Sequence, residues 1–306
     1  MNQHSSIKPG GSLLERAADK FDFAAALRGA ARNGSDAAPE AAPVPAPAEI
    51  IPMRAQPVGP APAGRHAEVD RARLVAEGFA LPDMRPGPLA EEFRVVKRQL
   101  LLRAAGQGAA RIVNGRMILV GSAKPDDGKT FCAINLALSM ARETDLDVVL
   151  ADCDFSKPEL PRKFGVEDGP GLMDAIADDS CDIEACLIHT DIPNLSILPA
   201  GRHSDDATEH LAAKRTSAVF ERLLARSPTR IVVCDTSPVL SASSASVLAL
   251  HAGQTVFVVK ADKTTEAELR ESLNLLDGCD RIDLLLNAVN FAPNGQRFGD
   301  YYGYGD

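Results

Sequence analysis

The residues with the clearest chemical potential stand between an apolar run and a helical pattern. The run MILV at 117–120 is followed by GSAKPDDGKT at 121–130, which opens the apolar helical pattern of 129–142. A loop in this position directs backbone N–H groups and the positive end of a helix at one point, where polyphosphate oxygens bind. Lys129 adds a positive charge, and Thr130 offers a hydroxyl to Mg²⁺. The sequence therefore predicts a phosphate-binding loop (P-loop).

The loop departs from the common pattern GxxxxGK[ST] at one position, because Ala123 stands where the first glycine would be. The GKT triplet between a strand and a helix is kept, and the alternative is an ordinary strand-to-helix turn without a ligand. The predicted nucleotide-binding residues of this segment are Gly121, Ser122, Lys124, Pro125, Asp126, Asp127, Gly128, Lys129, Thr130 and Phe131.

Carboxylates follow two further apolar runs. VVLADCD ends with Asp152 and Asp154, and IVVCDTSP contains Asp235. Strands also end in Asp for reasons of turn geometry, but nucleotide sites in open sheets collect their groups at the carboxyl ends of neighbouring strands. We predict Lys129, Asp152, Asp154 and Asp235 as catalytic and Thr130, Asp152 and Asp235 as metal-binding. Asp152 is the candidate base and Asp154 the support for the metal.

The tyrosines are confined to one end of the chain. Tyr301, Tyr302 and Tyr304 all fall within the last six residues, YYGYGD, after a segment that contains Gly, Asn and Pro. Packing does not readily explain a core without tyrosine and a tail with three. Flexible tyrosines flanked by glycine suit phosphorylation by a neighbouring active site, whereas the alternative is a merely solvated end.

Short apolar strands alternate with helical patterns over most of the chain, which predicts an α/β fold with a mostly parallel sheet covered by helices on both faces. The expected strands are 117–121, 147–151, 195–199, 230–234, 254–260 and 282–287. The expected helices are 89–104, 129–142, 217–226, 243–251 and 265–276.

The composition divides the chain into four parts. Residues 1–36 contain a short amphipathic helical pattern at 12–28, suited to docking on a partner or membrane or else only marginally helical. Residues 37–88 are rich in Ala and Pro and are predicted to be a disordered linker. Residues 89–292 form the predicted nucleotide-binding domain, and 293–306 are the predicted flexible tyrosine tail.

The bulk properties of the 306 residues exclude several classes. A net charge of −9 argues against general affinity for nucleic acid. Six cysteines without a CxxC pair suit reduced thiols in a core rather than a metal site. No apolar run reaches the length of a membrane-spanning helix, so we expect a cytoplasmic protein.

Together the segments GSAKPDDGKT, VVLADCDFSKP and IVVCDTSP resemble the modified Walker A, Walker A′ and Walker B motifs of the bacterial tyrosine kinases, which are related to the MinD and ParA ATPases. The resemblance covers about 91–306 and is strongest to the tyrosine autokinase of exosortase and exopolysaccharide loci. It implies a MinD-like P-loop fold, ATP and Mg²⁺ as cofactors, autophosphorylation of the tail in trans and a contact of Asn287 with the base. Many members have an Arg two residues after the second Asp of Walker A′, whereas here Phe155, Ser156 and Lys157 follow Asp154.

The resemblance also implies partners. A membrane-embedded polysaccharide chain-length or co-polymerase protein would activate the kinase and hold it at the inner membrane, and a cognate tyrosine phosphatase is an expected partner. Glu91, Arg94 and Lys97 are similar to a helical motif that family members use to form rings, although Lys97 replaces an Arg. At helical spacing Glu91, Arg94 and either Lys97 or Arg98 share a face, and a solvated helix face is the alternative.

Two other functions remain open. Lys124 has the spacing of the signature lysine that MinD-type ATPases insert into a partner's site, so a dimerising ATPase in positioning or assembly is the main alternative. A non-catalytic scaffold regulated by nucleotide is the third, and the full set of phosphate- and metal-binding residue types argues against it.

Overall fold

The computed structural model describes residues 64–106, 112–204, 207–276, 278–279 and 281–289. The predicted helix at 12–28, most of the predicted linker, and the tail with Tyr301, Tyr302 and Tyr304 lie outside the described residues. Within the described ranges, no helix has both the length and the apolar character that crossing a membrane requires.

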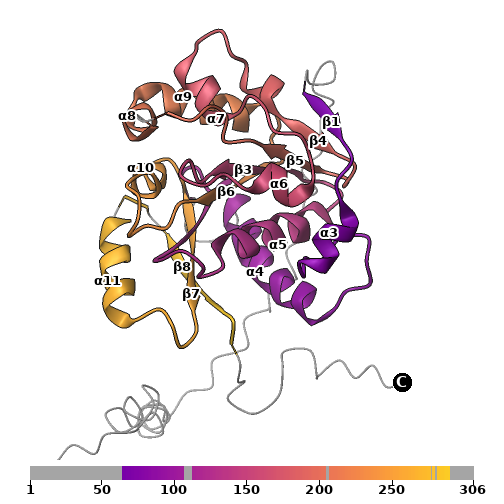
Figure 1. Cartoon of the computed structure of the whole chain (residues 1–306), viewed down its shortest axis with the longest axis vertical. Helices are drawn as coiled ribbons and strands as arrows, with labels where there is room; N and C mark the ends of the chain where they lie inside the picture. Colours follow the sequence, from indigo (N-terminus) through magenta and orange to yellow (C-terminus); the bar gives the residue numbers. More distant parts are fainter. Residues whose placement is uncertain (1–63, 107–111, 205–206, 277, 280, 290–306) are drawn as a thin grey trace, which may run out of the picture. The chain divides into compact units, whose positions relative to one another are not determined.

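The described strands form one sheet in the order β1-β4-β5-β3-β6-β2-β7-β8 (Figure 1). Neighbouring strands pair in parallel except β4 and β5, which are antiparallel. The strands are β1 (Arg65–Ala67), β2 (Met117–Ser122), β3 (Asp147–Cys153), β4 (Ile188–Thr190), β5 (Leu195–Leu198), β6 (Arg230–Thr236), β7 (Gln254–Lys260) and β8 (Ile282–Asn287).

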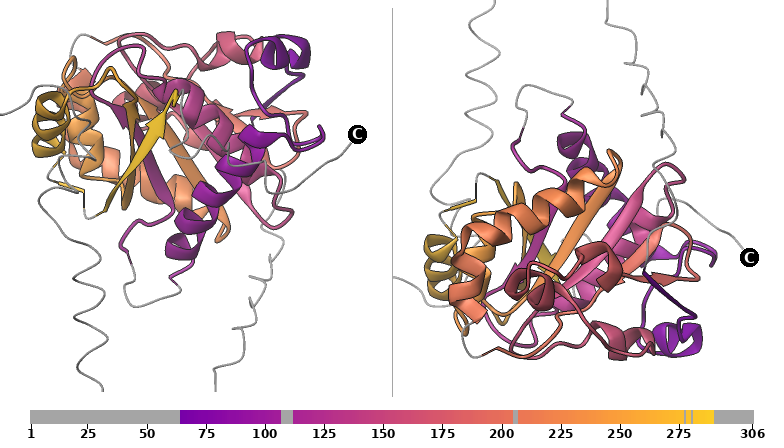
Figure 2. Two further views of the ribbon diagram at one scale, coloured as in Figure 1. Left: turned by 90° about the horizontal axis from the view of Figure 1, so that it is seen from below. Right: turned by 90° about the horizontal axis from the view of Figure 1, so that it is seen from above.

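Helices cover both faces of the sheet (Figure 2). One core contains side chains of α3 (Arg71–Ala76), α4 (Pro88–Ala104), α5 (Lys129–Ala141) and α6 (Leu160–Phe164). The other core contains side chains of α7 (Leu172–Ala177), the 3₁₀ helix η1 (Ile183–Cys186), α8 (Ala207–Ala212), α9 (Lys214–Ala225) and α10 (Ser244–Ala249), and α11 (Glu266–Leu275) packs at its margin. The predicted fold class is thereby confirmed.

The pleat of β2 explains why both faces are apolar. Met117 and Leu119 enter one core, whereas Ile118 and Val120 enter the other. All six residues of β2 and all seven of β6 are buried, as expected for central strands of a parallel sheet. The register sets Asp235 beside both Val120 and Asp152, so the P-loop and the two carboxylate-bearing strand ends meet at one edge.

The folded part of the chain begins earlier in the sequence than predicted. The sequence predicts a linker up to residue 88, but β1 and α3 lie within 64–88. Leu74, Phe79 and Leu81 of this segment are buried in the same core as side chains of α5. Asp70 caps α3 by accepting a hydrogen bond from the Arg73 N–H at 2.9 Å. This segment has few large apolar residues, but they are buried because the apolar side chains of the neighbouring α5 and α6 pack against them.

Lys97 of α4 is buried, in contrast to the expectation that it shares an exposed helix face with Glu91 and Arg94. Lys97 is only 5% exposed, donates to the Ser139 carbonyl at 2.7 Å and pairs with Glu143 at 2.6 Å. Its ammonium is therefore engaged within its own chain and does not share a solvent-facing surface with Arg94, which pairs with Glu91 at 3.1 Å. A contact between subunits through this helix would have to use other side chains than Lys97.

Candidate nucleotide site

The P-loop joins β2 to α5 through a backbone that its own side chains hold in shape. Gly128 precedes α5 with φ 98°, in the left-handed region that favours glycine. The Asp127 carboxylate accepts from the Lys124 N–H at 3.0 Å, and the Ser122 hydroxyl donates to the Lys124 carbonyl at 2.9 Å. Ser122 and Asp127 therefore shape the loop from within.

Neighbouring strands β7 and β8 brace the loop from outside. The Asn287 side-chain amide donates to the Asp127 carbonyl at 2.9 Å, and Lys260 donates to the Asp126 carbonyl at 2.8 Å. A Cβ on Gly128 would collide with the Asn287 amide, so glycine is also needed there for close approach. Asn287 is thus placed at the loop, whereas its contact with a base stays a prediction.

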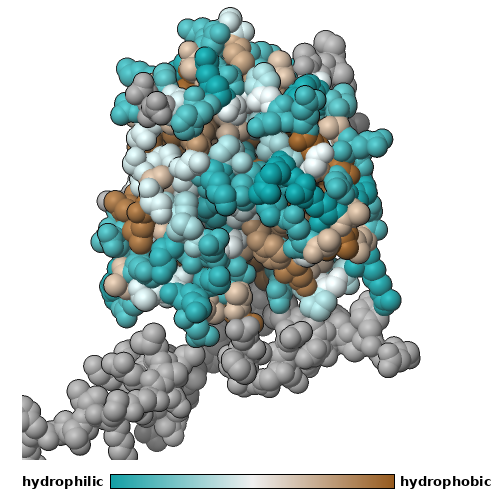
Figure 3. All heavy atoms as spheres, viewed as in Figure 1, coloured by the Kyte–Doolittle hydropathy of each residue, from teal (hydrophilic) through white to brown (hydrophobic). Residues whose placement is uncertain are grey.

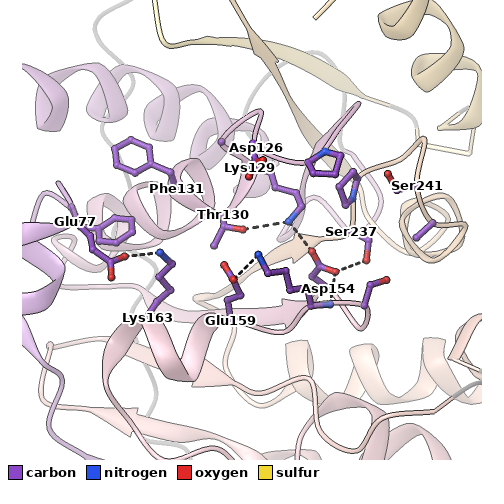
Figure 4. A pocket seen from close by; sticks show the side chains of 17 residues that line it. Glu77, Asp126, Lys129, Thr130, Phe131, Asp154, Glu159, Lys163, Ser237 and Ser241 are labelled. Carbon is purple, nitrogen blue, oxygen red and sulfur yellow. Dashed lines mark hydrogen bonds and ion pairs between the residues drawn. The ribbon is translucent and has the colours of Figure 1, made fainter. Parts of the chain in front are cut away.

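The Lys129 ammonium lies among carboxylates. It is 2.8 Å from Asp154 Oδ2, and the Thr130 hydroxyl lies at 3.4 Å (Figure 4). Asp235 Oδ1 lies 3.9 Å from the same ammonium. Burial alone would lower the pKa of Lys129, but the charges of Asp235 and Asp154 outweigh it, and the pKa is raised. Lys129 is therefore a fixed positive charge at the mouth of the P-loop.

Asp235 at the end of β6 has the character of a metal partner. It is 2% exposed, and its Oδ1 atom is buried without a hydrogen-bond partner. Burial raises its pKa to about 6, against the opposing effect of Lys129. Mg²⁺ is usually bound through one or two carboxylates together with substrate phosphates, so a buried carboxylate oxygen that accepts no hydrogen bond and lies near Thr130 fits this ion. Among the described residues, no group of three or more His, Cys, Asp or Glu side chains is placed to hold a metal ion.

The two aspartates at the carboxyl end of β3 have different environments. Asp152 is fully buried, and its oxygens accept from the N–H groups of Asp154 at 3.3 Å and of Glu159 and Leu160 at 2.9 Å each. Burial raises its pKa to about 7. Asp154 lines the pocket, pairs with Lys129 and accepts from the Ser237 hydroxyl at 2.7 Å.

The two aspartates are placed differently. Asp152 holds the loop that follows β3 and does not line the pocket, and its predicted role as base stays a prediction. Asp154 is the carboxylate of the two that lines the pocket.

A pocket of about 420 Å³ lies beside the P-loop (Figure 4). The predicted site residues that line it are Pro125, Asp126, Gly128, Lys129, Thr130, Phe131 and Asp154. Those that do not line it are Gly121, Ser122, Lys124, Asp127, Asp152, Asp235 and Asn287. The second group lies in the loop or at the strand ends around the pocket.

Ten of the seventeen residues that line the pocket lie outside the sequence prediction. The residues that were not predicted are Glu77, Phe79, Ser156, Lys157, Glu159, Lys163, Ser237, Pro238, Ser241 and Ala242. Ser237 could have been found, because it follows the Asp235 strand end directly. Glu77 and Phe79 could not be found in this way, because the sequence predicts a linker over the segment that contains them.

Lys124 points away from the pocket. Its ammonium pairs with Glu268 of α11 at 2.7 Å, and Glu268 also closes the capping box with Thr265. The Lys124 side chain and Thr265 lower the pKa of Glu268 to about 2. The lysine on which the dimerising-ATPase alternative rests is thus paired within its own chain.

The fold and the site define a P-loop nucleotide-binding domain. No family model matches the sequence. The chain is 30% identical over 206 residues to the putative tyrosine-protein kinase EpsB of Ralstonia solanacearum, covering 67% of this chain and 27% of EpsB. It is 25% identical over 219 residues to the putative tyrosine-protein kinase CapB of Staphylococcus aureus, covering 71% of this chain and 91% of CapB.

The chain is also similar in structure to the solved kinase domain of VpsO, with a TM-score of 0.55 and 28% sequence identity. The match covers 66% of this chain and 96% of the VpsO chain. EpsB and CapB are described as putative tyrosine-protein kinases and the VpsO structure as a kinase domain, so the predicted resemblance to the bacterial tyrosine kinases is confirmed. The matched part spans little more than a quarter of the length of relatives such as EpsB and the kinase wzc of Salmonella typhimurium.

Proposed function

We propose that this chain is an ATP-dependent protein-tyrosine kinase that phosphorylates its own tail in trans at Tyr301, Tyr302 and Tyr304. The observation that carries the proposal is the Lys129–Asp154 pair, which places a phosphate-binding cation and a pocket-lining carboxylate side by side at a P-loop. The kinase relatives support it.

The transfer follows from the positions of these side chains. Without nucleotide, Lys129 neutralises Asp154. A triphosphate in the P-loop competes for the ammonium and leaves the Asp154 carboxylate free to accept a proton. The phenol oxygen of the acceptor attacks the γ-phosphorus, the bond from that phosphorus to the bridging oxygen breaks, and ADP leaves with the bonding electrons. The phenol proton passes to Asp154, which the Ser237 hydroxyl orients.

Thr130 and Asp235 would hold Mg²⁺, which supplies charge neutralisation on the phosphates. Asp152 acts through the backbone, because the loop it fixes carries Asp154.

Partners and setting form part of the proposal. We infer a ring-like homo-oligomer that brings one subunit's tail to its neighbour's pocket, and a membrane polysaccharide co-polymerase that activates the kinase at the inner membrane. Control of exopolysaccharide synthesis or export, and a cognate phosphatase, follow from the resemblance to the kinase family. The subgroup of exosortase-associated autokinases stays a prediction.

The test is incubation of the purified full chain with ATP and Mg²⁺, followed by mapping of phosphate by mass spectrometry. We expect phosphate on the three tail tyrosines and none in Asp154→Asn. The membrane activator's cytoplasmic segment is added in a parallel reaction. Phosphotyrosine that persists in Asp154→Asn would contradict the proposal, as would unmodified tyrosines in both wild-type reactions.

A further inference from the structure

Cys181 and Cys186 bring two thiols into contact. Both are free cysteines, and their sulfur atoms lie 3.5 Å apart in one short segment between α7 and β4. A disulfide bond has a sulfur–sulfur distance of about 2.05 Å, so the two atoms need to approach each other by only about 1.5 Å. The pair is therefore close to the geometry of a disulfide while it is still reduced.

Two turns hold these thiols beside each other. The Cys181 N–H donates to the Asp178 carbonyl at 3.2 Å, and the Cys186 thiol donates to the Asp182 carbonyl at 3.5 Å. The Asp182 side chain caps η1 by accepting from the Glu184 N–H at 3.2 Å. Because Cys186 is the last residue of η1, the cap and the turn before it keep both sulfurs at the same short stretch of backbone.

The two thiols differ in their access to solvent. All six cysteines lie within the described residues, and Cys181 is the one that is not buried. Cys186 is 2% exposed, and burial raises its pKa to about 12, so it stays a thiol at neutral pH. The face of the domain over α8 and α9 is mainly hydrophilic (Figure 3), and α9 contacts both α7 and η1. A small polar oxidant therefore meets Cys181 first, and Cys186 is placed to react second.

We propose that Cys181 and Cys186 form a reversible intramolecular disulfide when a peroxide oxidises the protein. The Cys181 thiolate attacks one peroxide oxygen and the oxygen–oxygen bond breaks, and the hydroxide that leaves takes up the proton that Cys181 gave up. The Cys186 sulfur then attacks the sulfenic sulfur of Cys181. The sulfur–sulfur bond forms, the sulfur–oxygen bond breaks, and the departing hydroxide takes the Cys186 proton and leaves as water. The peroxide gains the two electrons that the thiols lose, and a dithiol reductant returns them.

The cross-link lies away from the nucleotide pocket. Glu184, inside the ring that the disulfide closes, pairs with the buried Arg230 at the amino end of β6, whereas Asp235 lies near the carboxyl end of the same strand. Closing the loop 181–186 restricts the unfolded chain, so the oxidised protein should unfold at higher urea than the reduced protein. The inference does not depend on the proposed function.

The experiment treats the reduced full chain with a small excess of hydrogen peroxide, unfolds it and blocks free thiols with iodoacetamide. The tryptic peptide 164–202 contains both cysteines of the pair. We expect this peptide to escape alkylation and to be lighter than its reduced form by about 2 Da, the two hydrogens lost. Cys132, Cys153, Cys234 and Cys279 should be alkylated, because they are buried in the folded chain and have no access to the oxidant. A dithiol reductant should restore both thiols and the urea midpoint of the reduced protein.

Single substitutions separate the two steps. Cys181→Ser changes a residue that is not buried, and it should leave Cys186 free to react with iodoacetamide after peroxide. Cys186→Ala should leave Cys181 as a sulfenic acid, which dimedone traps.

Alkylation of both thiols in peroxide-treated wild type would overturn the proposal. So would a bond from Cys181 to a second chain, or a sulfinic acid at Cys181 in place of the disulfide. None of these measurements needs phosphate transfer, so the absence of phosphotyrosine would count against the kinase proposal alone.

Discussion

Lys129 and Asp154 form an ion pair, 2.8 Å between Nζ and Oδ2, at the centre of the pocket, and Asp235 lies 3.9 Å from the same ammonium. One cation therefore balances two carboxylates that are less than a tenth exposed. Such a cluster stays in place without nucleotide, and it keeps the lysine ready for an incoming phosphate.

Lys129→Met should weaken ADP binding by about tenfold to one hundredfold, because a charged hydrogen-bond donor to the phosphates is lost. Calorimetry measures the change, and Lys263→Met, an exposed lysine outside the pocket, serves as the control. Similar ADP affinities in Lys129→Met and wild type would contradict the assignment of the loop.

Two variants should have different effects: Asp152→Asn should lower stability, whereas Asp154→Asn should lower phosphate transfer. An asparagine at 152 turns an amide N–H₂ toward backbone N–H groups that need an acceptor, so we expect a loss of about 1–3 kcal/mol in the free energy of unfolding. Urea unfolding measures it. Asp154→Asn should lose phosphotyrosine while binding ADP normally, and the reverse pattern would return the role of base to Asp152.

Leu74→Ala should destabilise the domain by about 2–5 kcal/mol, because Leu74 is fully buried in the core shared with α5. The adjacent Val75 is 43% exposed, and Val75→Ala should change the free energy of unfolding by less than about 0.5 kcal/mol. A chain that begins at residue 64 should unfold like the full chain, whereas one that begins at residue 88 should unfold at lower urea. Equal midpoints for the two shortened chains would show that the segment does not contribute to the fold.

His189 should make stability depend on pH. Burial, and then the neighbouring His66, lower the pKa of His189 from its ordinary 6.5, with Asp147 opposing and Arg230 adding to the effect. Below pH 6.5 the unfolded chain therefore binds a proton that the folded chain does not, and stability falls as the pH falls. His189→Gln should remove part of this loss in urea unfolding between pH 8 and 5. A variant with the wild-type pH dependence would refute the role of His189.

The central sheet and the motif positions could be predicted from sequence because they depend on local patterns. Each of the strands β2, β3 and β6 is a short apolar run with a predicted site residue at or next to its last position, and helices alternate with them. The weaker patterns of β1, β4, α3 and α6 to α8 were missed, because three to six residues carry too little periodicity.

The sequence by itself determined the class of site: a P-loop lysine and threonine, and carboxylates at two neighbouring strand ends. Only the tertiary structure decided which groups meet. In the folded chain Asp152 is buried, whereas Asp154 lines the pocket. Lys124 pairs with Glu268, and Lys97 pairs with Glu143. It also brought Phe79 onto Phe131 across 52 residues of sequence. Side-chain direction and long-range contact depend on packing between elements, which no local pattern encodes.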